Sequence, residues 1–330
     1  MKRLLTIVIA LTLLVGTITS ASAAPKEKLL VYTSMKEVLI GEIRDAFVKK
    51  HPEVQFDYYS AGAGKLMAKI AAERQSGKLM VDVLWTSEIP DFYQLKSQGA
   101  LEKYVSPEAA SIISPVKDPD GCFTPARLGT LGIAYNTNKV KVAPKTWQDL
   151  LGPQFKDGFG IANPSLSGTA MVSVAMLVEN LGWDYIKGLR ANGAKMGQGS
   201  GQVVDDVAMG DLKACIAVDY IAINKIQEGA PMGFVYPDKI LVIPSPVAIF
   251  KGTPNLSAAK KFVDFLLSKE GQAIIAASYT LPIRKDVPVV QGVGLVSPEE
   301  AVKRAFPLDY LKMIGEKEKI ADQFTAIMTK

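Results

Sequence analysis

The segment from Tyr58 to Ile70 contains Gly62-Ala63-Gly64-Lys65, a combination of residues that suits phosphate binding. The phosphate loop of nucleotide hydrolases has a glycine five residues before the one that precedes the lysine, and a serine or threonine after the lysine. Here these positions hold Tyr59 and Leu66. Leucine offers no oxygen to magnesium, and tyrosine lacks the backbone freedom of glycine. The sequence therefore excludes a nucleotide hydrolase and predicts a strand, a small polar corner and a helix whose first N–H groups are free.

A second corner of the same kind follows a predicted strand that ends at Asn163. Ser165, Ser167, Gly168 and Thr169 precede a predicted helix there, where hydroxyl groups, backbone N–H groups and the helix dipole attract negative charge. Together with the corner at Ser60-Ala61-Gly62, this segment predicts an anion site. Two alternatives stay open, because such residues also cap helices that bind no ligand, and because Lys65 can point to solvent instead of the ligand.

The elements that position the first corner alternate between strands and helices. The expected strands are 28–34, 54–60 and 81–87, and the expected helices are 37–50, 64–75 and 90–98. Such βαβ units form a mostly parallel sheet with right-handed crossovers, and its ligands bind beyond the carboxyl ends of the strands. Each of these strands ends in small polar residues, which are Thr33-Ser34, Ser60 and Thr86-Ser87.

A second α/β set follows, and two extended segments link it to the first. The expected elements are the strand 158–165, the helix 168–181, an amphipathic helix with Asp205 and Asp206 on its solvated face, a strand within 210–220 and the helix 221–228. Residues 122–136 and 239–250 are extended, and the prolines of the second segment disfavour a helix. Helices are expected over 256–277 and 298–330.

This order predicts two lobes. Lobe 1 is expected to comprise residues 28–125 and 245–285, lobe 2 residues 126–244, and the C-terminal helices of residues 286–330 to pack on the outside of lobe 2. A chain of 330 residues exceeds what one core usually serves, which agrees with two domains.

The N-terminus predicts export. Residues 1–23 form an expected signal peptide, with Lys2 and Arg3, an apolar run, and Ala21-Ser22-Ala23 as the cleavage site. An uncleaved anchor is the alternative, and no later segment reaches the ~18 apolar residues of a spanning helix. The expected location is the periplasm.

The overall charge and the cysteines exclude some classes and leave others open. A net charge of +5 without a block of lysine and arginine argues against nucleic acid as a partner. Cys122 and Cys215 either form a disulfide or remain two separate buried thiols.

Four segments together resemble one family. They are LLVYTSMKE, VDVLWTSE, GIAYNTNKVKVAPKTWQDLLGPQFKDGFGIANPSLSGTA and TLPIRKDVP. In this order they are similar to the periplasmic solute-binding proteins of ABC importers, in the branch that includes ferric-iron, hexose-phosphate and aminoethylphosphonate binders. The resemblance covers about Leu29 to Pro288. It implies an α/β fold of the two-lobed, type II-like periplasmic-binding-protein kind, in which two extended segments cross the hinge and the lobes close over a ligand.

The metal ligands of the ferric binders are missing from the corresponding positions. Ferric binders of this branch resemble one another in holding the metal with a pair of adjacent tyrosines. These tyrosines follow an apolar strand and two asparagines in the sequence. In CIAVDYIAI the asparagine positions hold Asp219 and Tyr220, and the tyrosine positions hold Ile221 and Ala222, which are not metal ligands. Met35 stands where those binders often have histidine or glutamine, and its thioether suits a hard ferric ion poorly. No metal site and no cofactor are therefore predicted.

An organic body attached to the anion needs contacts of its own. Asp219 and Glu88 can accept hydrogen bonds from a hydroxyl or an ammonium group, and Trp85 and Tyr220 can cover a ring or an alkyl chain. Trp85 is equally a candidate for the core.

The predicted function is that of a monomeric receptor without catalytic residues. It would capture a small anionic solute, a phosphate ester or phosphonate by preference, and deliver it to an inner-membrane ABC permease. The candidate ligand-binding residues are Ser34, Met35, Ser60, Ala61, Gly62, Thr86, Ser87, Glu88, Ser165, Ser167, Gly168, Thr169, Asp219 and Tyr220.

Three alternative functions remain. The first is a ferric or ferric-chelate binder that uses a single tyrosine. The second is a secreted phosphate-ester hydrolase, for which the lone His51 and the lack of a nucleophile–base pair give little support. The third is a two-lobed sensor that serves a membrane kinase.

Overall fold

One nine-stranded β-sheet runs through the part of the chain that the computed structural model describes, residues 27–114 and 118–330. The predicted signal peptide, residues 1–23, lies outside the described residues. The strand order is β2-β1-β3-β9-β4-β7-β5-β6, and β8 pairs with β4. The strands are β1 Glu27–Thr33, β2 Val54–Ser60, β3 Val83–Trp85, β4 Thr124–Asn136, β5 Phe159–Ala162, β6 Lys195–Gly197, β7 Ala214–Val218, β8 Met232–Val235 and β9 Leu241–Ile249.

Strand direction differs between the ends and the centre of this sheet. At one end β1 pairs in parallel with β2 and β3, and at the other end β5 pairs in parallel with β6 and β7. In the centre β9 is antiparallel to β3 and β4, and β4 is antiparallel to β7 and β8. The expectation of a mostly parallel sheet is therefore right at the ends and wrong in the centre, where the two extended segments join the sheet.

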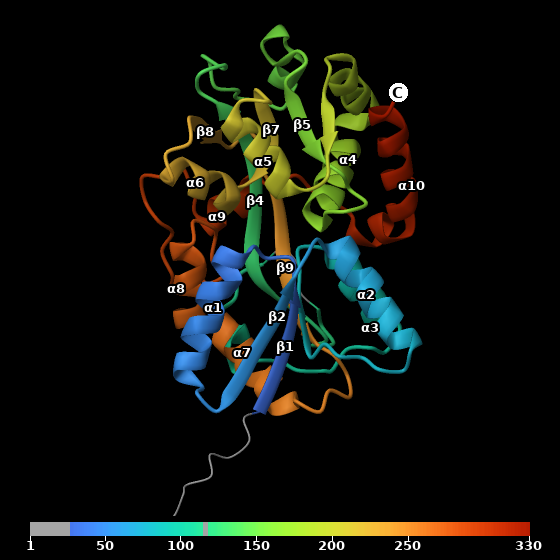
Figure 1. Cartoon of the computed structure of the whole chain (residues 1–330), viewed down its shortest axis with the longest axis vertical. Helices are drawn as coiled ribbons and strands as arrows, with labels where there is room; N and C mark the ends of the chain where they lie inside the picture. The colour runs from blue at the N-terminus through green and yellow to red at the C-terminus, as the bar shows by residue number, and fades with distance from the viewer. Residues whose placement is uncertain (1–26, 115–117) are drawn as a thin grey trace, which may run out of the picture.

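Two long strands connect the two halves of the molecule (Figure 1). Residues 124–131 of β4 pair with β9, and residues 131–136 pair with β7 and β8. Strand β9 in turn reaches β3 through residues 247–249. The fold is thus two-lobed with two hinge-crossing extended segments, as expected. The boundaries given above for lobes 1 and 2 stay a proposal, and the two names are used in that sense below.

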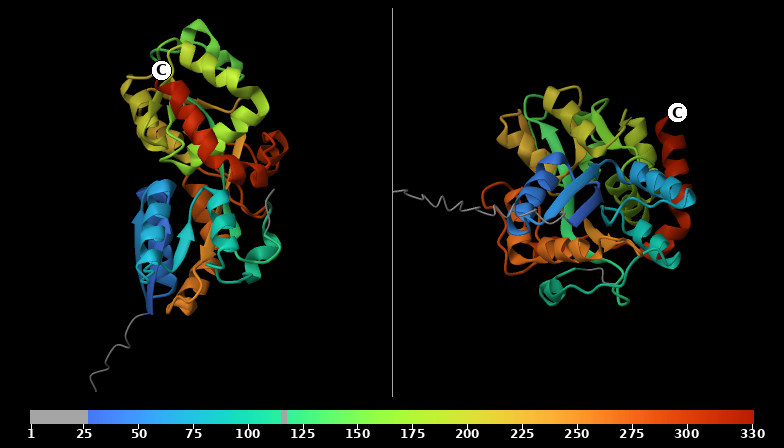
Figure 2. Two further views of the ribbon diagram at one scale, coloured as in Figure 1. Left: turned by 90° about the vertical axis from the view of Figure 1, so that its right-hand side faces the viewer. Right: turned by 60° about the horizontal axis from the view of Figure 1, so that its bottom comes forward.

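Helices cover both faces of the sheet in each lobe (Figures 1 and 2). In lobe 1, α1, α7 and α8 pack together on one side, and α2 and α3 lie on the other. In lobe 2, α4 packs into the main core, and α5 and α6 cover β4 and β7. The helices are α1 Glu37–Lys50, α2 Ala63–Gln75, α3 Ile89–Ser97, α4 Gly168–Ala191, α5 Ser200–Met209, α6 Asp219–Gln227, α7 Leu256–Leu267, α8 Lys269–Ala277, α9 Pro298–Arg304 and α10 Tyr310–Met328.

Helix α4 shows how the sequence sets helix ends. It begins after Ser167, whose hydroxyl accepts a hydrogen bond from the backbone N–H of Ala170 at 3.3 Å. Gly182 interrupts it with a φ of 80°, a left-handed value that glycine adopts at no steric cost. The predicted helix over 168–181 is therefore the first segment of α4, and the second segment was not predicted.

The two cysteines occupy different hydrophobic clusters and are free thiols. Cys122 lies among the residues that α2 and α3 cover in lobe 1, and Cys215 lies on β7 in lobe 2. Burial raises the pKa of the Cys215 thiol. Of the two alternatives, the structure has two separate buried thiols.

The C-terminal helix α10 contacts both lobes. It packs along α4 of lobe 2 and also touches α3 of lobe 1. Phe324 and Met328 of α10 are buried in the main core. The sequence predicts that the C-terminal helices pack on the outside of lobe 2. The contact between α10 and α3 of lobe 1 was not part of that prediction.

Candidate ligand-binding site

A cavity of about 450 Å³ lies between the two lobes. Its lining includes the N-terminal ends of five helices in the described part of the chain. The N-cap residues are Lys36 for α1, Gly62 for α2, Ser167 for α4, Gly199 for α5 and Val218 for α6. Each helix brings free backbone N–H groups and the positive end of its dipole to the cavity. This arrangement favours a negatively charged ligand.

The tips of α2 and α4 touch across the cavity. A Cβ atom on Gly62 would overlap the carbonyl oxygen of Leu166, and one on Gly64 would lie 2.6 Å from the carbonyl oxygen of Ser165. A Cβ atom on Gly168 would lie 2.8 Å from Cβ of Glu88. The three glycines therefore permit the close approach of the two lobes.

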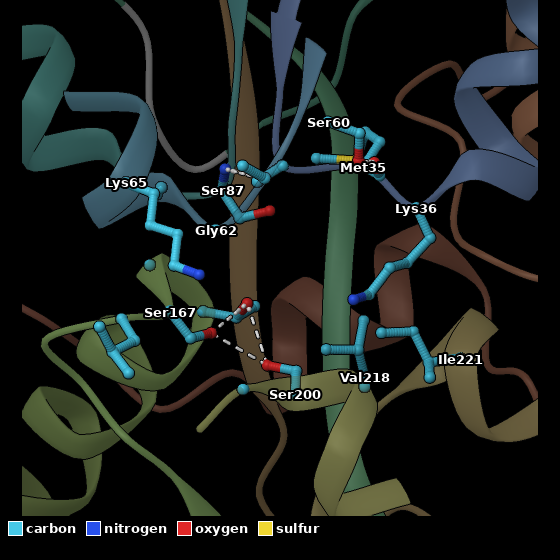
Figure 3. A pocket seen from close by; sticks show the side chains of 18 of the residues that line it. Met35, Lys36, Ser60, Gly62, Lys65, Ser87, Ser167, Ser200, Val218 and Ile221 are labelled. Carbon is cyan, nitrogen blue, oxygen red and sulfur yellow. Dashed lines mark hydrogen bonds between the residues drawn. The ribbon is translucent and has the colours of Figure 1, made fainter. Parts of the chain in front are cut away.

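Three hydroxyl groups of lobe 2 form a cluster at the cavity (Figure 3). The hydroxyl of Ser167 lies 3.0 Å from that of Ser200 and 3.3 Å from that of Thr169. Ser200 is the first residue of α5, so this cluster joins the N-termini of α4 and α5. The Ser167 hydroxyl thus caps α4 and also faces the cavity.

Two lysine side chains enter the cavity from opposite sides (Figure 3). Lys65 projects from α2, and Lys36 precedes α1. Both are solvent-exposed, and neither ammonium group has an ion pair or hydrogen bond among the described residues. The Lys36 ammonium lies close to Gly201 in the first turn of α5, so two positive centres are adjacent there.

Arg127 adds a third cation, and this one is buried. It lies at the irregular pairing of β4 with β9, and only 1% of its surface is exposed. Its guanidinium donates hydrogen bonds to the hydroxyls of Ser245 and Thr280 and lies 5.1 Å from the centre of the Tyr220 ring. The Tyr220 hydroxyl accepts a hydrogen bond from the backbone N–H of Lys36 at 3.0 Å, which links lobe 2 to lobe 1.

Asp219 lies behind Arg127 and outside the cavity lining. Its carboxylate accepts hydrogen bonds from the hydroxyls of Thr130 and Thr280 at 2.7 and 2.8 Å, and from the backbone N–H of Tyr220. Its distance from the Arg127 guanidinium is 4.0 Å. Burial raises its pKa, and Arg127 opposes the rise. These contacts give Asp219 a role in holding Arg127 and the hinge.

Glu88 also lies outside the lining. Its carboxylate forms an ion pair with Lys317 of α10, which pairs with Asp91 at 2.7 Å as well. Burial raises the pKa of Glu88 to about 7, the Asp91 charge adds to the rise, and Lys317 opposes it. Two carboxyl groups that are almost fully buried thus share one cation.

The cavity brings together ten of the predicted residues and leaves out four. Those that line it are Ser34, Met35, Ser60, Ala61, Gly62, Ser87, Ser167, Gly168, Thr169 and Tyr220; those outside it are Thr86, Glu88, Ser165 and Asp219. Trp85 is fully buried in the core and also lies outside. Whether the lining residues bind the ligand stays a prediction.

Sequence reasoning missed Lys36, Arg127 and Ser200 as lining residues. Ser200 had a visible signal, since it stands in Gly197-Gln198-Gly199-Ser200-Gly201 directly before the amphipathic helix. Arg127 had a weaker one, a single charge in an otherwise small and apolar extended segment. Nothing in the sequence distinguished Lys36 from other exposed lysines.

The described residues contain no group of three or more histidine, cysteine, aspartate or glutamate side chains suited to a metal ion. Two tyrosines, Tyr59 and Tyr220, line the cavity. Burial raises the pKa of Tyr220, and its hydroxyl accepts a hydrogen bond from the backbone N–H of Lys36. Residues 27–114 and 118–330 also include no helix long and apolar enough to span a membrane.

Known proteins resemble this chain over most of its length. The model of a family described as bacterial extracellular solute-binding protein matches residues 80–312. A putative 2-aminoethylphosphonate-binding periplasmic protein of Salmonella typhimurium is 28% identical over 255 residues, 74% of this chain and 73% of that protein. The periplasmic binding protein AfuA from Actinobacillus pleuropneumoniae, with exogenous fructose-6-phosphate bound, has a TM-score of 0.80 and 26% identity, covering 92% of this chain and 98% of that one. Iron-bound HitA from Pseudomonas aeruginosa has a TM-score of 0.77 and 24% identity, covering 91% and 99%.

Proposed function

The chain belongs to the bacterial extracellular solute-binding proteins, and from that premise we propose that it captures a phosphate ester or phosphonate between its lobes. Proteins of this kind bind small solutes for ABC transporters. The finer assignment is that the chain acts in the periplasm after removal of residues 1–23 and passes its ligand to an inner-membrane ABC permease as a monomer. Its relatives are transport proteins and not enzymes, which supports a receptor without catalytic residues.

The observation that carries the proposal is the charge of the cavity. Five helix N-termini and three cations, Lys36, Lys65 and Arg127, line it, and within residues 27–114 and 118–330 two of these cations, Lys36 and Lys65, have no ion-pair partner. A phosphate monoester carries roughly 1.5 to 2 negative charges at neutral pH and a phosphonate between one and two, which suits a cavity with two unpaired ammonium groups. The hydroxyls of Ser167, Thr169 and Ser200 can donate to its oxygens.

The size of the cavity supports an organic ligand over inorganic phosphate. Small-molecule pockets have volumes of roughly 300–1,000 Å³, and this cavity of about 450 Å³ lies in that range. A phosphate ion alone would leave most of this volume to water molecules of about 30 Å³ each. The AfuA structure holds fructose-6-phosphate, and the Salmonella relative is named for a phosphonate, which agrees with a phosphorus-bearing headgroup.

The proposal is tested by thermal unfolding and titration calorimetry with the purified mature protein. The probes are 2-hydroxyethyl phosphate, glycerol 3-phosphate and fructose 6-phosphate, with inorganic phosphate and ferric citrate as comparisons. We expect at least one organic phosphate to raise the melting temperature and to bind more tightly than inorganic phosphate. A response to ferric citrate alone, with the visible absorbance of an iron–tyrosinate complex, would contradict the proposal and support an iron binder.

Lysine variants connect binding to this cavity. Lys36→Met and Lys65→Met should each weaken organic phosphate binding by about tenfold, since each removes a charge-assisted interaction. Lys49→Met and Lys78→Met are matched controls, because both lysines are exposed in lobe 1 and lie outside the lining. If all four variants bind equally well, the ligand lies elsewhere.

A further inference from the structure

The part of the chain that the structure describes brings no acidic side chain to the lining of the cavity. Among the described residues that line it, three are cations and none is aspartate or glutamate. The remaining polar groups are neutral, and they include Gln198 and Gln202 at the start of α5. The distribution of charge therefore affects which organic groups the cavity can hold, as well as which headgroup it binds.

Three acidic residues stand at helix N-termini but lie outside the lining of the cavity and have partners of their own. Glu37, the first residue of α1, accepts a hydrogen bond from the hydroxyl of Tyr58 at 2.5 Å. Glu88 is covered by the tip of α4 at Gly168 and pairs with Lys317. Asp219 accepts four hydrogen bonds and compensates Arg127 from behind. Glu88 and Asp219 are buried with their partners, and Glu37 lies outside the lining of the cavity.

An ammonium group on the ligand would therefore lack a counter-charge. Ammonium carries three N–H donors and a full positive charge, and it needs acceptors and a nearby anion when it leaves water. Here it would face Lys36, Lys65, Arg127 and the positive ends of five helix dipoles. A hydroxyl group of the same size meets no such repulsion, because it can both donate to the amide oxygens and accept from the lysines.

We propose that this cavity selects phosphates and phosphonates whose organic part is uncharged or anionic, and that it discriminates against those that carry an ammonium group. The inference rests on the proposed function, since it concerns the same site. The proposal therefore disfavours 2-aminoethylphosphonate, the ligand in the name of the Salmonella relative, as a ligand of this chain. That relative is 28% identical to this chain.

The experiment compares ligands that differ in one group only. One pair is 2-aminoethylphosphonate and 2-hydroxyethylphosphonate, and the other is O-phosphoethanolamine and 2-hydroxyethyl phosphate. Calorimetry at pH 7 should give at least tenfold tighter binding for the hydroxyl member of each pair. Equal or tighter binding of the amines would overturn the inference and leave the phosphate-binding function intact. If neither member of either pair binds, and glycerol 3-phosphate and fructose 6-phosphate do not bind either, the proposed function fails and the inference fails with it.

A gain-of-binding variant tests the physical reason. Gln198 is an exposed lining residue just before α5, and Gln198→Glu places a carboxylate there near a helix N-terminus, where it is tolerated. The variant should raise the affinity for each amine, relative to its hydroxyl partner, at least fivefold. Gln94→Glu is the control, since Gln94 is exposed on α3 outside the cavity, and it should leave the ratio unchanged. An unchanged ratio in Gln198→Glu would contradict the counter-charge argument.

Discussion

Glu88 and Asp91 are two buried carboxyl groups that share one cation, Lys317. Only 3% of the Glu88 side chain and 2% of the Asp91 side chain are exposed. Burial raises the pKa of both, and one oxygen of Asp91, together with the Thr86 hydroxyl, has no hydrogen-bond partner among the described residues. One positive charge does not compensate two buried negative charges, so the cluster holds a proton more readily than free carboxyl groups do.

This cluster predicts a pH dependence of stability. The pKa of Glu88 is about 7 in the folded chain and about 4.5 in the unfolded one. Between pH 4.5 and 7 the folded state binds a proton that the unfolded state has released, so the free energy of unfolding falls as pH rises through this window. The fall should be on the order of 3 kcal/mol. In Glu88→Gln the neutral amide removes this contribution, and Lys317 keeps Asp91 as its single partner.

Chemical denaturation at pH 4.5 and pH 8 measures the effect. The loss of unfolding free energy between the two values should be smaller in Glu88→Gln than in the wild type by about 3 kcal/mol. Glu318→Gln is the matched control, because Glu318 is an exposed carboxylate on the same helix as Lys317. Identical pH dependence in Glu88→Gln and the wild type would refute the buried titration.

At the scale of elements, the glycines of the GAGK segment matter because they let the first turn of α2 approach lobe 2 closely. Gly62 and Gly64 at the start of α2 lie directly against the carbonyl oxygens of Leu166 and Ser165. These contacts are with backbone, which cannot move aside as a flexible side chain can. A methyl group at either position would hold the lobes apart and disfavour the closed state in which a ligand touches both helix tips.

Gly64→Ala should therefore weaken ligand binding without weakening the fold. Alanine is a better helix former than glycine by up to about 1 kcal/mol, so the free energy of unfolding of the ligand-free protein should stay equal or rise slightly. The affinity for an organic phosphate should fall at least tenfold, because closure now requires a clash. Denaturation and calorimetry on the same preparation separate the two effects.

Gly41→Ala is the control for this prediction. Gly41 is in the interior of α1, and a Cβ atom there would meet nothing within 4 Å. The substitution should bring the same gain in helix stability and no change in affinity. A Gly64→Ala variant that binds as tightly as Gly41→Ala would show that closure does not need the glycine contact.

Local patterns predicted these elements well, and contacts between distant segments were harder to predict. The bounds of α1 and β2 follow from hydrophobic periodicity and from the turn at His51-Pro52, which are local. The polar corners at Ser60 and Ser167 were predicted because a strand end and a helix start are adjacent in sequence. Glu88 and Asp219 occupy similar corners, but their environment depends on Lys317 and Arg127, which are distant in sequence. No local pattern reveals such a partner.

At the scale of the whole molecule, the lobes bring like charges together when they approach. Lys36 and Lys65 belong to lobe 1, the first turns of α4, α5 and α6 belong to lobe 2, and Arg127 lies on the strand that joins them. Without a ligand these positive centres repel one another. An anion in the cavity removes the repulsion, so its affinity for the closed form exceeds that for the open form, and the population shifts accordingly.

Electrostatic opening predicts a response to salt that small-angle X-ray scattering can detect. In the ligand-free wild type the radius of gyration should be larger at about 0.01 M salt, where the Debye length is about 30 Å, than at about 1 M, where it is about 3 Å. The double variant Lys36→Met/Lys65→Met should have the smaller radius at both concentrations, because most of the repulsion is gone. Lys49→Met/Lys78→Met removes the same number of charges from exposed positions of lobe 1 and should behave as the wild type. If the Lys36→Met/Lys65→Met protein expands at low salt as much as the wild type does, charge repulsion across the cavity is not what keeps the empty lobes apart.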